Sequence, residues 1–345
     1  MKGLAVILVE SKKPLVLEQI EMPPLTFGQV LVKVLCSGIC GAQINEIDAV
    51  KGPDKFLPHL LGHEATAEVL EAGSGVKTVA AGDRVVMHWR KGAGIEAPTP
   101  AYASRLGPIN AGWVTTFNEY AVVSENRITK VPADFDPESG ALLGCAVTTA
   151  FGVINNDAQL KIGESVVVFG AGGVGLNIVQ GAAMVSAHPI IAIDLYDNKL
   201  ALAKELGATH CINAARADPQ PEILKIVGAA GVDVAVDNTG NIKVIEQAYA
   251  VTSARGRTIL VGVPPKGQQA SIYTLPLHFE KILKGSHGGN CRPEYDIPNY
   301  VRLCQAGKLS LKPLIGRRYS LAQINEAIEA MRSGGVAGRC LVRME

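Results

Sequence analysis

The stretch SVVVFGAGGVG, residues 165–175, decides the fold of this chain. Its first five residues form an apolar run of strand length, and Gly170, Gly172 and Gly175 then fit the pattern G-x-G-x-x-G before a helix-like run over 174–185. The first glycine allows a tight turn, the second lets backbone approach a pyrophosphate, and the third allows close helix–strand packing. We therefore predict a dinucleotide site with the phosphates at the helix N-terminus, formed by Gly170, Gly172, Gly173, Val174 and Gly175.

An acidic residue at the end of the next strand completes this pattern. Asp194 closes the apolar run 189–194, and it lies 19 residues after Gly175 (194 − 175 = 19). Its carboxylate is expected to accept hydrogen bonds from ribose hydroxyls and to repel a 2′-phosphate, which favours NAD over NADP. Lys199 either helps to hold the ribose or is a solvated helix lysine. A generic tight turn or a Rossmann-like methyltransferase would also explain the glycines.

The region around this stretch alternates strands with helices. Apolar strands are expected at 232–237 and 257–262, and a helix over 199–206 ends before Gly207. Apolar strands that alternate with helices indicate a parallel sheet covered on both faces. We predict an α/β fold with a Rossmann doubly wound parallel sheet over residues 147–287.

The rest of the chain has a different pattern. Before residue 146, strand-like runs at 30–34, 65–69 and 83–87 alternate with turn residues, so this part is predicted to be β-rich. Residues 90–112 are rich in Gly, Pro, Ala and Ser and are predicted to form a long irregular loop. The run 339–343 reads as a strand that returns to the first domain, so residues 1–146 and 288–345 are predicted to form one domain.

Composition limits the possible functions. The chain has 345 residues, a net charge of +1 and 48% hydrophobic residues, which suits a two-domain enzyme and does not indicate a nucleic-acid or membrane partner. The N-terminal run is expected to be a first strand and not a signal peptide. The seven cysteines are an odd number and widely spaced, so we expect reduced thiols in a cytoplasmic protein. Five of them are expected to be buried or inert: Cys36, Cys211, Cys291, Cys304 and Cys340.

Two further cysteines and a histidine have the chemistry of a metal site. Cys40, His63 and Cys145 offer two thiolates and one imidazole, a ligand set that suits a zinc ion with one open position. The alternative for His63 by itself is a hydrogen-bonded core histidine. A Lewis acid and a hydride carrier in one chain indicate alcohol–carbonyl redox chemistry.

These motifs together resemble the zinc-dependent medium-chain alcohol dehydrogenase family, and the second half resembles its class III branch. The resemblance covers nearly the whole chain and rests on SGIC at 37–40, LGHE at 61–64, LLGC at 142–145, the glycine stretch with Asp194, ELGAT at 205–209 and VGVPP at 261–265. It implies a β-rich GroES-like catalytic domain beside the Rossmann domain, and a homodimer or homotetramer.

The resemblance also implies roles for individual residues. Cys40, His63 and Cys145 would be the ligands of one catalytic zinc, and Glu64 the glutamate behind it, with a buried ion pair to Arg339 as the alternative for Glu64. The remaining assignments are Arg339 at the cofactor pyrophosphate, Thr149 and Val263 at the nicotinamide, and Trp89 and Gln43 in the substrate pocket.

The chain departs from this family at three points. Residues 88–120 contain no cysteine, which excludes the structural tetrathiolate zinc of many relatives, and aromatic residues are expected to hold that loop instead. Ala42 and Asn45 stand where the family has the hydroxyl and histidine of its proton relay. Gln43 replaces an aspartate that orients the ligand histidine, which should lower ligand basicity. A glutathione-linked substrate is therefore not expected.

The sequence thus predicts a zinc- and NAD-dependent dehydrogenase of a secondary alcohol, namely a polyol, sugar or sugar derivative. Proton transfer would use another group, a water chain or a substrate hydroxyl, with His88 and Arg90 as candidates. The alternatives are a metal-free medium-chain quinone or enone reductase and a non-catalytic nucleotide-binding protein of the same fold.

Overall fold

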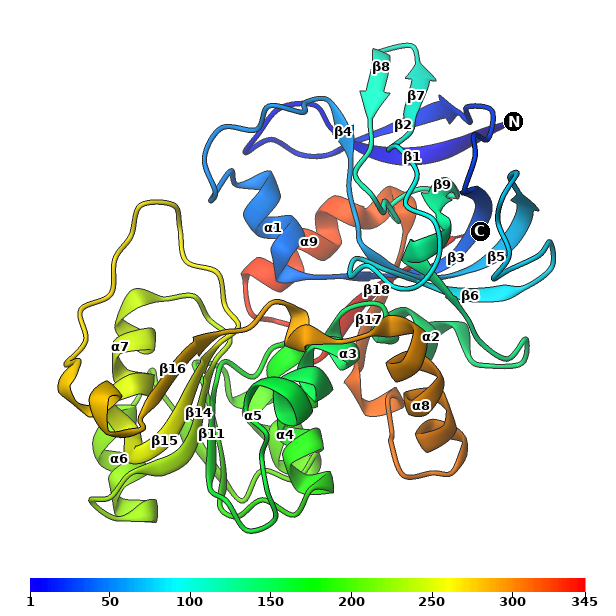
Figure 1. Cartoon of the computed structure of the whole chain (residues 1–345). Helices are drawn as coiled ribbons and strands as arrows, with labels where there is room; N and C mark the ends of the chain where they lie inside the picture. Colours follow the sequence, from blue (N-terminus) through cyan, green and yellow to red (C-terminus); the bar gives the residue numbers. More distant parts are fainter. Residues whose placement is uncertain (345) are drawn as a thin grey trace. The chain divides into compact units, whose positions relative to one another are not determined.

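The computed structural model describes residues 1–344, which divide into two compact units. Unit 1 comprises Met1–Cys145 and the segment from Arg292 onward, and unit 2 comprises Ala146–Cys291 (Figure 1). The boundaries expected from sequence, after residues 146 and 287, lie close to these.

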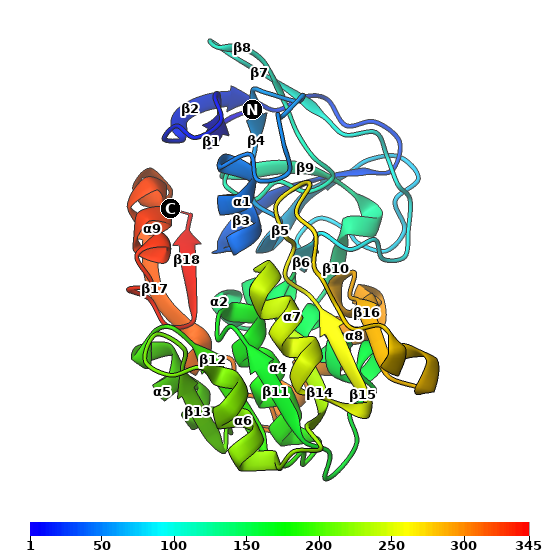
Figure 2. The ribbon, with the colours of Figure 1, turned by 90° about the vertical axis from the view of Figure 1, so that its left-hand side faces the viewer.

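Unit 2 is built on a parallel sheet of six strands in the order β13-β12-β11-β14-β15-β16. The strands are β11 (Val166–Phe169), β12 (Ile190–Asp194), β13 (His210–Asn213), β14 (Val232–Asp237), β15 (Thr252–Leu260) and β16 (Ile282–Gly285). The helices are α3 (Ala146–Gly152), α4 (Gly173–Met184), α5 (Asp197–Glu205), α6 (Pro219–Val227) and α7 (Ile242–Val251), and Figure 2 shows α5, α6 and α7 beside the strands.

The glycine stretch occupies the centre of this sheet, as its apolar flanks predict. All four residues of β11 are buried, and the strand lies between β12 and β14 in parallel register. Helix α4 contacts β11 and β12, while α7 contacts β14 and β15. A strand surrounded by neighbouring strands and helices must be apolar along its whole length, as β11 is. The parallel sheet with these helices packed on it confirms the prediction of a doubly wound α/β fold.

Unit 1 contains a closed barrel and a seven-stranded sheet. The barrel has the order β1-β2-β7-β8-β4, and the sheet has the order β10-β6-β5-β3-β18-β17 with β9 also paired to β3. The barrel strands are β1 (Lys2–Leu8), β2 (Val16–Glu21), β4 (His59–Leu60), β7 (Ala101–Ser104) and β8 (Gly107–Asn110). The sheet strands are β3 (Gln29–Ile39), β5 (Glu64–Ala72), β6 (Arg84–His88), β9 (Tyr120–Ser124), β10 (Ile128–Lys130), β17 (Ile315–Ser320) and β18 (Arg339–Arg343).

Strand β3 organises the sheet of unit 1. Its first half pairs with β9 and its second half pairs with β18, both antiparallel, while β5 pairs along its other edge. The end of the chain therefore returns to the first domain, as expected. Four helices complete this unit: α1 (Gly41–Ile47), α2 (Pro137–Leu143), α8 (Pro293–Gln305) and α9 (Ile324–Arg332).

The prediction of an irregular loop over 90–112 is wrong in its second half. Strands β7 and β8 form an antiparallel hairpin in which Tyr102 pairs with Ile109 and both side chains are buried. Gly107 makes the turn with a φ of +94°, which a residue with a side chain rarely adopts. The many Gly, Pro and Ala residues hid an alternation of buried and exposed side chains.

Two smaller findings concern possible membrane-spanning helices and the burial of the cysteine thiols. Among residues 1–344 no single helix is long and apolar enough to cross a membrane, and only the bent pair 137–143 with 146–158 passes by length and composition. Cys36, Cys291 and Cys340 are buried as expected and Cys304 is partly buried, but Cys211 at the start of the sheet edge strand β13 is exposed.

The hairpin provides a test of the barrel core. The buried Tyr102 hydroxyl accepts a hydrogen bond from the Val122 backbone N–H at 2.8 Å. Tyr102→Phe would leave that N–H unsatisfied, so the free energy of unfolding should fall by about 1–3 kcal/mol in urea denaturation. Tyr273→Phe, on a side chain that is 69% exposed, is the matched control and should change it by less than about 0.5 kcal/mol. Equal effects of the two variants would contradict this account.

Candidate functional site

Cys40, His63 and Cys145 converge in unit 1, as the sequence predicts. Cys40 follows β3 and caps α1, His63 lies between β4 and β5, and Cys145 follows α2. One ligand atom from each residue lies within 4.8 Å of the other two. Residues more than one hundred positions apart in sequence therefore form a single ligand cluster.

The donor atoms of this cluster fit a zinc ion. The Nε2 atom of His63 is buried and has no hydrogen-bond partner, as a ring nitrogen reserved for a metal would be. The Cys145 side chain hydrogen-bonds the Cys40 sulfur and holds the pKa of Cys40 well below its ordinary value. The same hydrogen bond raises the pKa of Cys145. Two sulfurs and one imidazole nitrogen form a set that zinc prefers, with a fourth position left open.

A buried ion pair lies behind the ligands. The Glu64 side chain is fully buried, and its Oε1 lies 3.2 Å from the Arg339 Nε atom. Arg339 also donates from Nη1 to the Ile39 carbonyl at 3.2 Å. Despite desolvation, the charges of Glu64 and Cys40 hold the pKa of Arg339 above its ordinary value, so the guanidinium stays charged. The alternative for Glu64, an ion pair with Arg339, is therefore what the structure contains, and a role for Arg339 at the pyrophosphate stays a prediction.

Glycines near the two cysteines make room for Glu64. A Cβ on Gly144 would lie 2.3 Å from the Met87 carbonyl oxygen and 2.9 Å from the Glu64 Cβ. A Cβ on Gly38 would lie 2.6 Å from the Glu64 Oε1. Both contacts are too short for a side chain. The motifs SGIC and LLGC therefore need their glycines because the glutamate of LGHE occupies that space.

Gln43 links two of the ligands. Its Oε1 accepts a hydrogen bond from the Cys40 backbone N–H at 2.9 Å, and its Nε2 contacts the Nδ1 of His63. A histidine that binds metal through Nε2 carries its proton on Nδ1 and needs an acceptor there. The Gln43 side chain can accept from Nδ1 only if its amide group flips so that Oε1 faces His63. The flip breaks the hydrogen bond between Oε1 and the Cys40 N–H. The predicted fall in ligand basicity stays a prediction, and the geometry adds that Gln43 cannot keep both contacts.

Helix α1 carries no proton-relay side chain at the two positions noted from the sequence. The proposal that His88 takes over this role is wrong. Ala42 and Asn45 lie on this helix without a hydroxyl or an imidazole. His88 is 1% exposed, with Nδ1 bonded to the Arg90 carbonyl at 2.7 Å and Nε2 to the Thr129 hydroxyl at 2.9 Å. Burial lowers the pKa of His88 to about 4, so it is a neutral structural residue that lacks a free nitrogen to receive a proton.

The loop without cysteines is held by cation–aromatic contacts and ion pairs. The Arg127 guanidinium lies 4.7 Å from the Trp113 ring centre, bonds the Trp89 carbonyl, and pairs with Glu96 at 3.1 Å. Phe117 and Tyr102 are buried, but the Trp113 side chain is 58% exposed because its ring covers an arginine and not the core. The place of Trp89 in a substrate pocket stays a prediction.

The glycine stretch in unit 2 forms the expected turn. Gly170 has a φ of +90°, and a Cβ on Gly175 would lie 1.9 Å from the Gly170 carbonyl oxygen. Gly172 caps helix α4, and the space that a Cβ would occupy there is open. The first N–H groups of a helix have no partner within it, so this terminus can bind an anion.

Asp194 is held against that turn. Its Oδ2 accepts from the Ala171 N–H at 2.8 Å, and its Oδ1 accepts from the Leu195 N–H at 2.8 Å and lies 3.9 Å from the Lys199 ammonium. The Thr149 hydroxyl is buried without a hydrogen-bond partner, and Val263 is 52% exposed. This loop and its acid fit a dinucleotide, while the individual contacts stay predictions.

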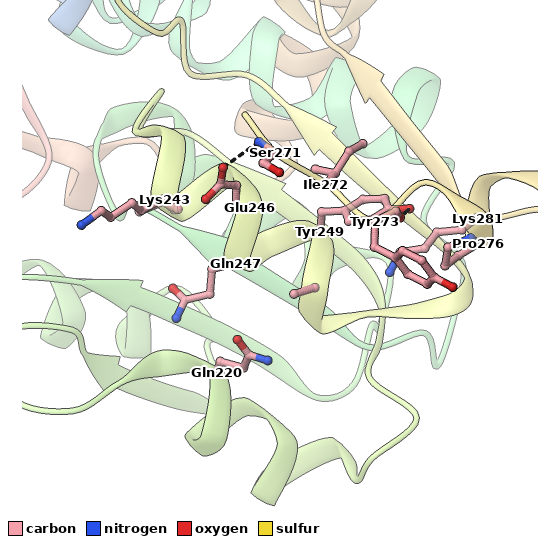
Figure 3. Close-up of a pocket in the computed structure, with 12 residues that line it drawn as sticks. Gln220, Lys243, Glu246, Gln247, Tyr249, Ser271, Ile272, Tyr273, Pro276 and Lys281 are labelled. Atoms are coloured by element: carbon pink, nitrogen blue, oxygen red, sulfur yellow. Dashed lines mark hydrogen bonds between the residues drawn. The ribbon is translucent and has the colours of Figure 1, made fainter. Parts of the chain in front are cut away.

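A separate pocket of about 700 Å³ lies in unit 2 between α7 and residues 271–281 (Figure 3). The Tyr249 hydroxyl donates to the Tyr273 carbonyl at 2.9 Å, and the Lys281 ammonium lies 4.2 Å from the Tyr249 ring centre. The residues that line this pocket include none of the predicted site residues.

Sequence reasoning also missed a cluster of Glu46, Asp54 and His59 in unit 1, for which the one signal was a histidine four positions before His63.

Comparison with known proteins agrees with this geometry. Residues 26–133 match the alcohol dehydrogenase GroES-like domain, and residues 173–306 match the zinc-binding dehydrogenase family. The S-(hydroxymethyl)glutathione dehydrogenase of Escherichia coli O6:H1 is 31% identical over 361 residues, covering 97% of this chain and 98% of the relative.

Solved structures show the same fold over the whole chain. Benzyl alcohol dehydrogenase from Acinetobacter calcoaceticus superposes with a TM-score of 0.90 at 27% identity and covers 100% of both chains. The 2R,3R-butanediol dehydrogenase from Bacillus subtilis has a TM-score of 0.80 at 28% identity and covers 99% of both chains.

Gln43 provides a test of the ligand geometry. In Gln43→Glu, one carboxylate accepts from both the Cys40 N–H and a protonated His63 Nδ1, so zinc affinity should rise by about 10–100-fold in chelator competition. Asn45→Asp adds the same charge to the same helix and is the matched control. An equal gain in both variants would show that general electrostatics, and not the orientation of His63, sets the affinity.

Proposed function

Because this chain belongs to the zinc-dependent medium-chain alcohol dehydrogenase family, we propose that it uses zinc and NAD to oxidise a secondary alcohol or to reduce the matching carbonyl. The observation that carries this proposal is the convergence of Cys40, His63 and Cys145 on one point, with an unpartnered ring nitrogen among them. Relatives named for benzyl alcohol and for butanediol support an oxidoreductase that acts on CH–OH groups.

The residues of unit 1 would hold the metal and set its surroundings. When bound, zinc supplies a Lewis acid that makes an alcohol hydroxyl more acidic, and NAD supplies the hydride acceptor. Cys40, His63 and Cys145 would fix three positions and leave the fourth to substrate or water. The buried ion pair of Glu64 and Arg339 would hold their backbone in place without occupying that position.

The proton of the alcohol would leave by an unusual route. Ala42 offers no hydroxyl, Asn45 offers no titratable group, and His88 has both nitrogens engaged. We infer that a second hydroxyl of the substrate, or ordered water, receives it. This favours a polyol, a sugar or a sugar derivative over a simple alcohol.

The residues of unit 2 would hold the cofactor. The N-terminus of α4 would face the pyrophosphate, Asp194 would accept from the adenosine ribose, and Thr149 and Val263 would contact the nicotinamide. The Asp194 carboxylate would repel a 2′-phosphate, which favours NAD.

We also propose a homodimer that forms at the β16 edge of the parallel sheet. Strand β16 ends the sheet order, so one side of it has no neighbour within that sheet. Ile282 at the start of this strand is 44% exposed, and Leu275 and Phe279 in the segment before it are 51% and 66% exposed. An apolar edge strand favours pairing with a second copy. A homotetramer would add a second interface to this one.

Metal analysis combined with turnover tests the proposed activity. Purified protein should contain about one tightly held zinc per chain and should reduce NAD with some polyol, sugar or secondary alcohol. Cys145→Ser should lower both zinc content and turnover by more than the ~100-fold that changes around metal ligands cost. Cys304→Ser, on a partly buried thiol of α8, is the matched control. A fully active protein without zinc would indicate a metal-free reductase, and cofactor binding without turnover would indicate a non-catalytic protein.

Asp194 provides a test of cofactor choice. Asp194→Asn keeps an oxygen for the Ala171 N–H and removes the charge. A hydrogen bond to a charged group contributes about 1.5–3 kcal/mol, so NAD affinity should fall by about 10–100-fold while NADP affinity does not fall. Asp197→Asn, an exposed acid at the start of α5, is the matched control for isothermal titration calorimetry. An unchanged ratio of the two affinities would refute the assignment.

A further inference from the structure

Glu46, Asp54 and His59 form a second cluster of ligand-type side chains in unit 1. One ligand atom from each lies within 4.8 Å of the others. Glu46 comes from α1, Asp54 from the connection that follows it, and His59 from β4, all in the blue part of Figure 1. None of the three belongs to the Cys40, His63 and Cys145 cluster.

The surrounding hydrogen bonds aim the ligand atoms at one point. The His59 ring is 6% exposed, and its Nδ1 lies 2.8 Å from the Leu60 carbonyl oxygen, so Nδ1 carries a proton and donates it. Nε2 is then directed at the Asp54 Oδ2, 2.8 Å away. The other oxygen of Asp54 accepts from the Phe56 N–H at 2.8 Å. A donating second ring nitrogen and a hydrogen-bonded carboxylate are the outer contacts that orient metal ligands.

Two acceptors that face each other at 2.8 Å need a cation between them. A single proton on Nε2 satisfies His59 and Asp54, but Glu46 then keeps a negative charge 4.0 Å from the same nitrogen. A divalent ion balances both carboxylates. Ligand atoms around tetrahedral zinc lie about 3.3–3.5 Å apart, between the observed separations of 2.8 and 4.0 Å, so small side-chain rotations suffice.

We propose that Glu46, Asp54 and His59 bind a divalent cation of the zinc type, with water completing its coordination. Imidazole and carboxylate ligands without a thiolate give weaker zinc binding than the cysteine cluster. The Glu46 side chain is 46% exposed, which leaves a path to solvent and room for water.

The position of this site gives it a structural role. Helix α1 begins directly after Cys40, and β4 ends three residues before His63. A cation that joins Glu46 to His59 links the two segments that carry these residues. The chain lacks the cysteines of the structural zinc in its relatives, and this site would stabilise a different connection, residues 48–58.

Metal binding to the purified full-length protein tests this site independently of the proposed activity. Equilibrium dialysis against zinc should reveal two equivalents per chain, one tight and one weaker. With Co²⁺, the tight equivalent should show the intense near-ultraviolet absorption of thiolate ligation, and the weaker one only weak visible bands. His59→Gln and Asp54→Asn should abolish the weaker equivalent and leave the thiolate absorption unchanged.

Two further variants complete the experiment. Glu46→Gln, on a side chain that is 46% exposed, should weaken the second equivalent by at least about 10-fold. His210→Gln, at an exposed histidine in unit 2, should leave both equivalents unchanged. Two outcomes would overturn the proposal: a single zinc equivalent in the unaltered protein under excess zinc, or a second equivalent that persists in His59→Gln and Glu46→Gln. A proton between His59 and Asp54 would then be the only cation in the cluster.

Discussion

The buried pair of Glu64 and Arg339 is the interaction on which unit 1 of this molecule depends. Two charges in a dry interior stabilise each other only as a pair, and loss of one partner typically costs about 3–5 kcal/mol because the other stays buried and charged. Glu64 begins β5 and Arg339 begins β18, so the pair joins the first third of the chain to its last strand. The bond from Arg339 to the Ile39 carbonyl adds the end of β3, directly before Cys40.

This pair explains why the ligand motifs have their form. Each motif carries a glycine, and the glycines at 38 and 144 leave the space in which the Glu64 side chain lies. Beside the hydrogen bond from Cys145, the charged guanidinium also lowers the pKa of Cys40. The ion pair therefore contributes to the shape and to the electrostatics of the ligand cluster, although neither of its members belongs to that cluster.

Departures from the family pattern cluster on one short helix. Helix α1 carries Ala42, Gln43 and Asn45 where the resemblance leads one to expect relay and orienting residues, and it also carries Glu46, which faces a histidine of β4. The helix begins directly after Cys40, so any change in how it is held acts on that residue. The proposed substrate class and the proposed second cation site both arise from this helix.

The sequence by itself determined the Rossmann sheet, the turn at Gly170 and Gly175, and which three thiol and imidazole side chains were candidates for a metal site. These features depend on local rules, namely apolar runs, glycine spacing and the chemistry of thiol and imidazole groups, which a linear pattern carries in full. Tertiary structure decided which polar side chains meet, including the Glu64–Arg339 pair that the sequence offered only as an alternative. It engaged both nitrogens of His88, placed Arg339 against Glu64, exposed Trp113 over Arg127, and brought His59 to Asp54 and Glu46. Partners of this kind come from distant segments of the chain, so the spacing of residues in the sequence does not specify them. Buried polar groups nevertheless require partners, because an unpaired one is costly.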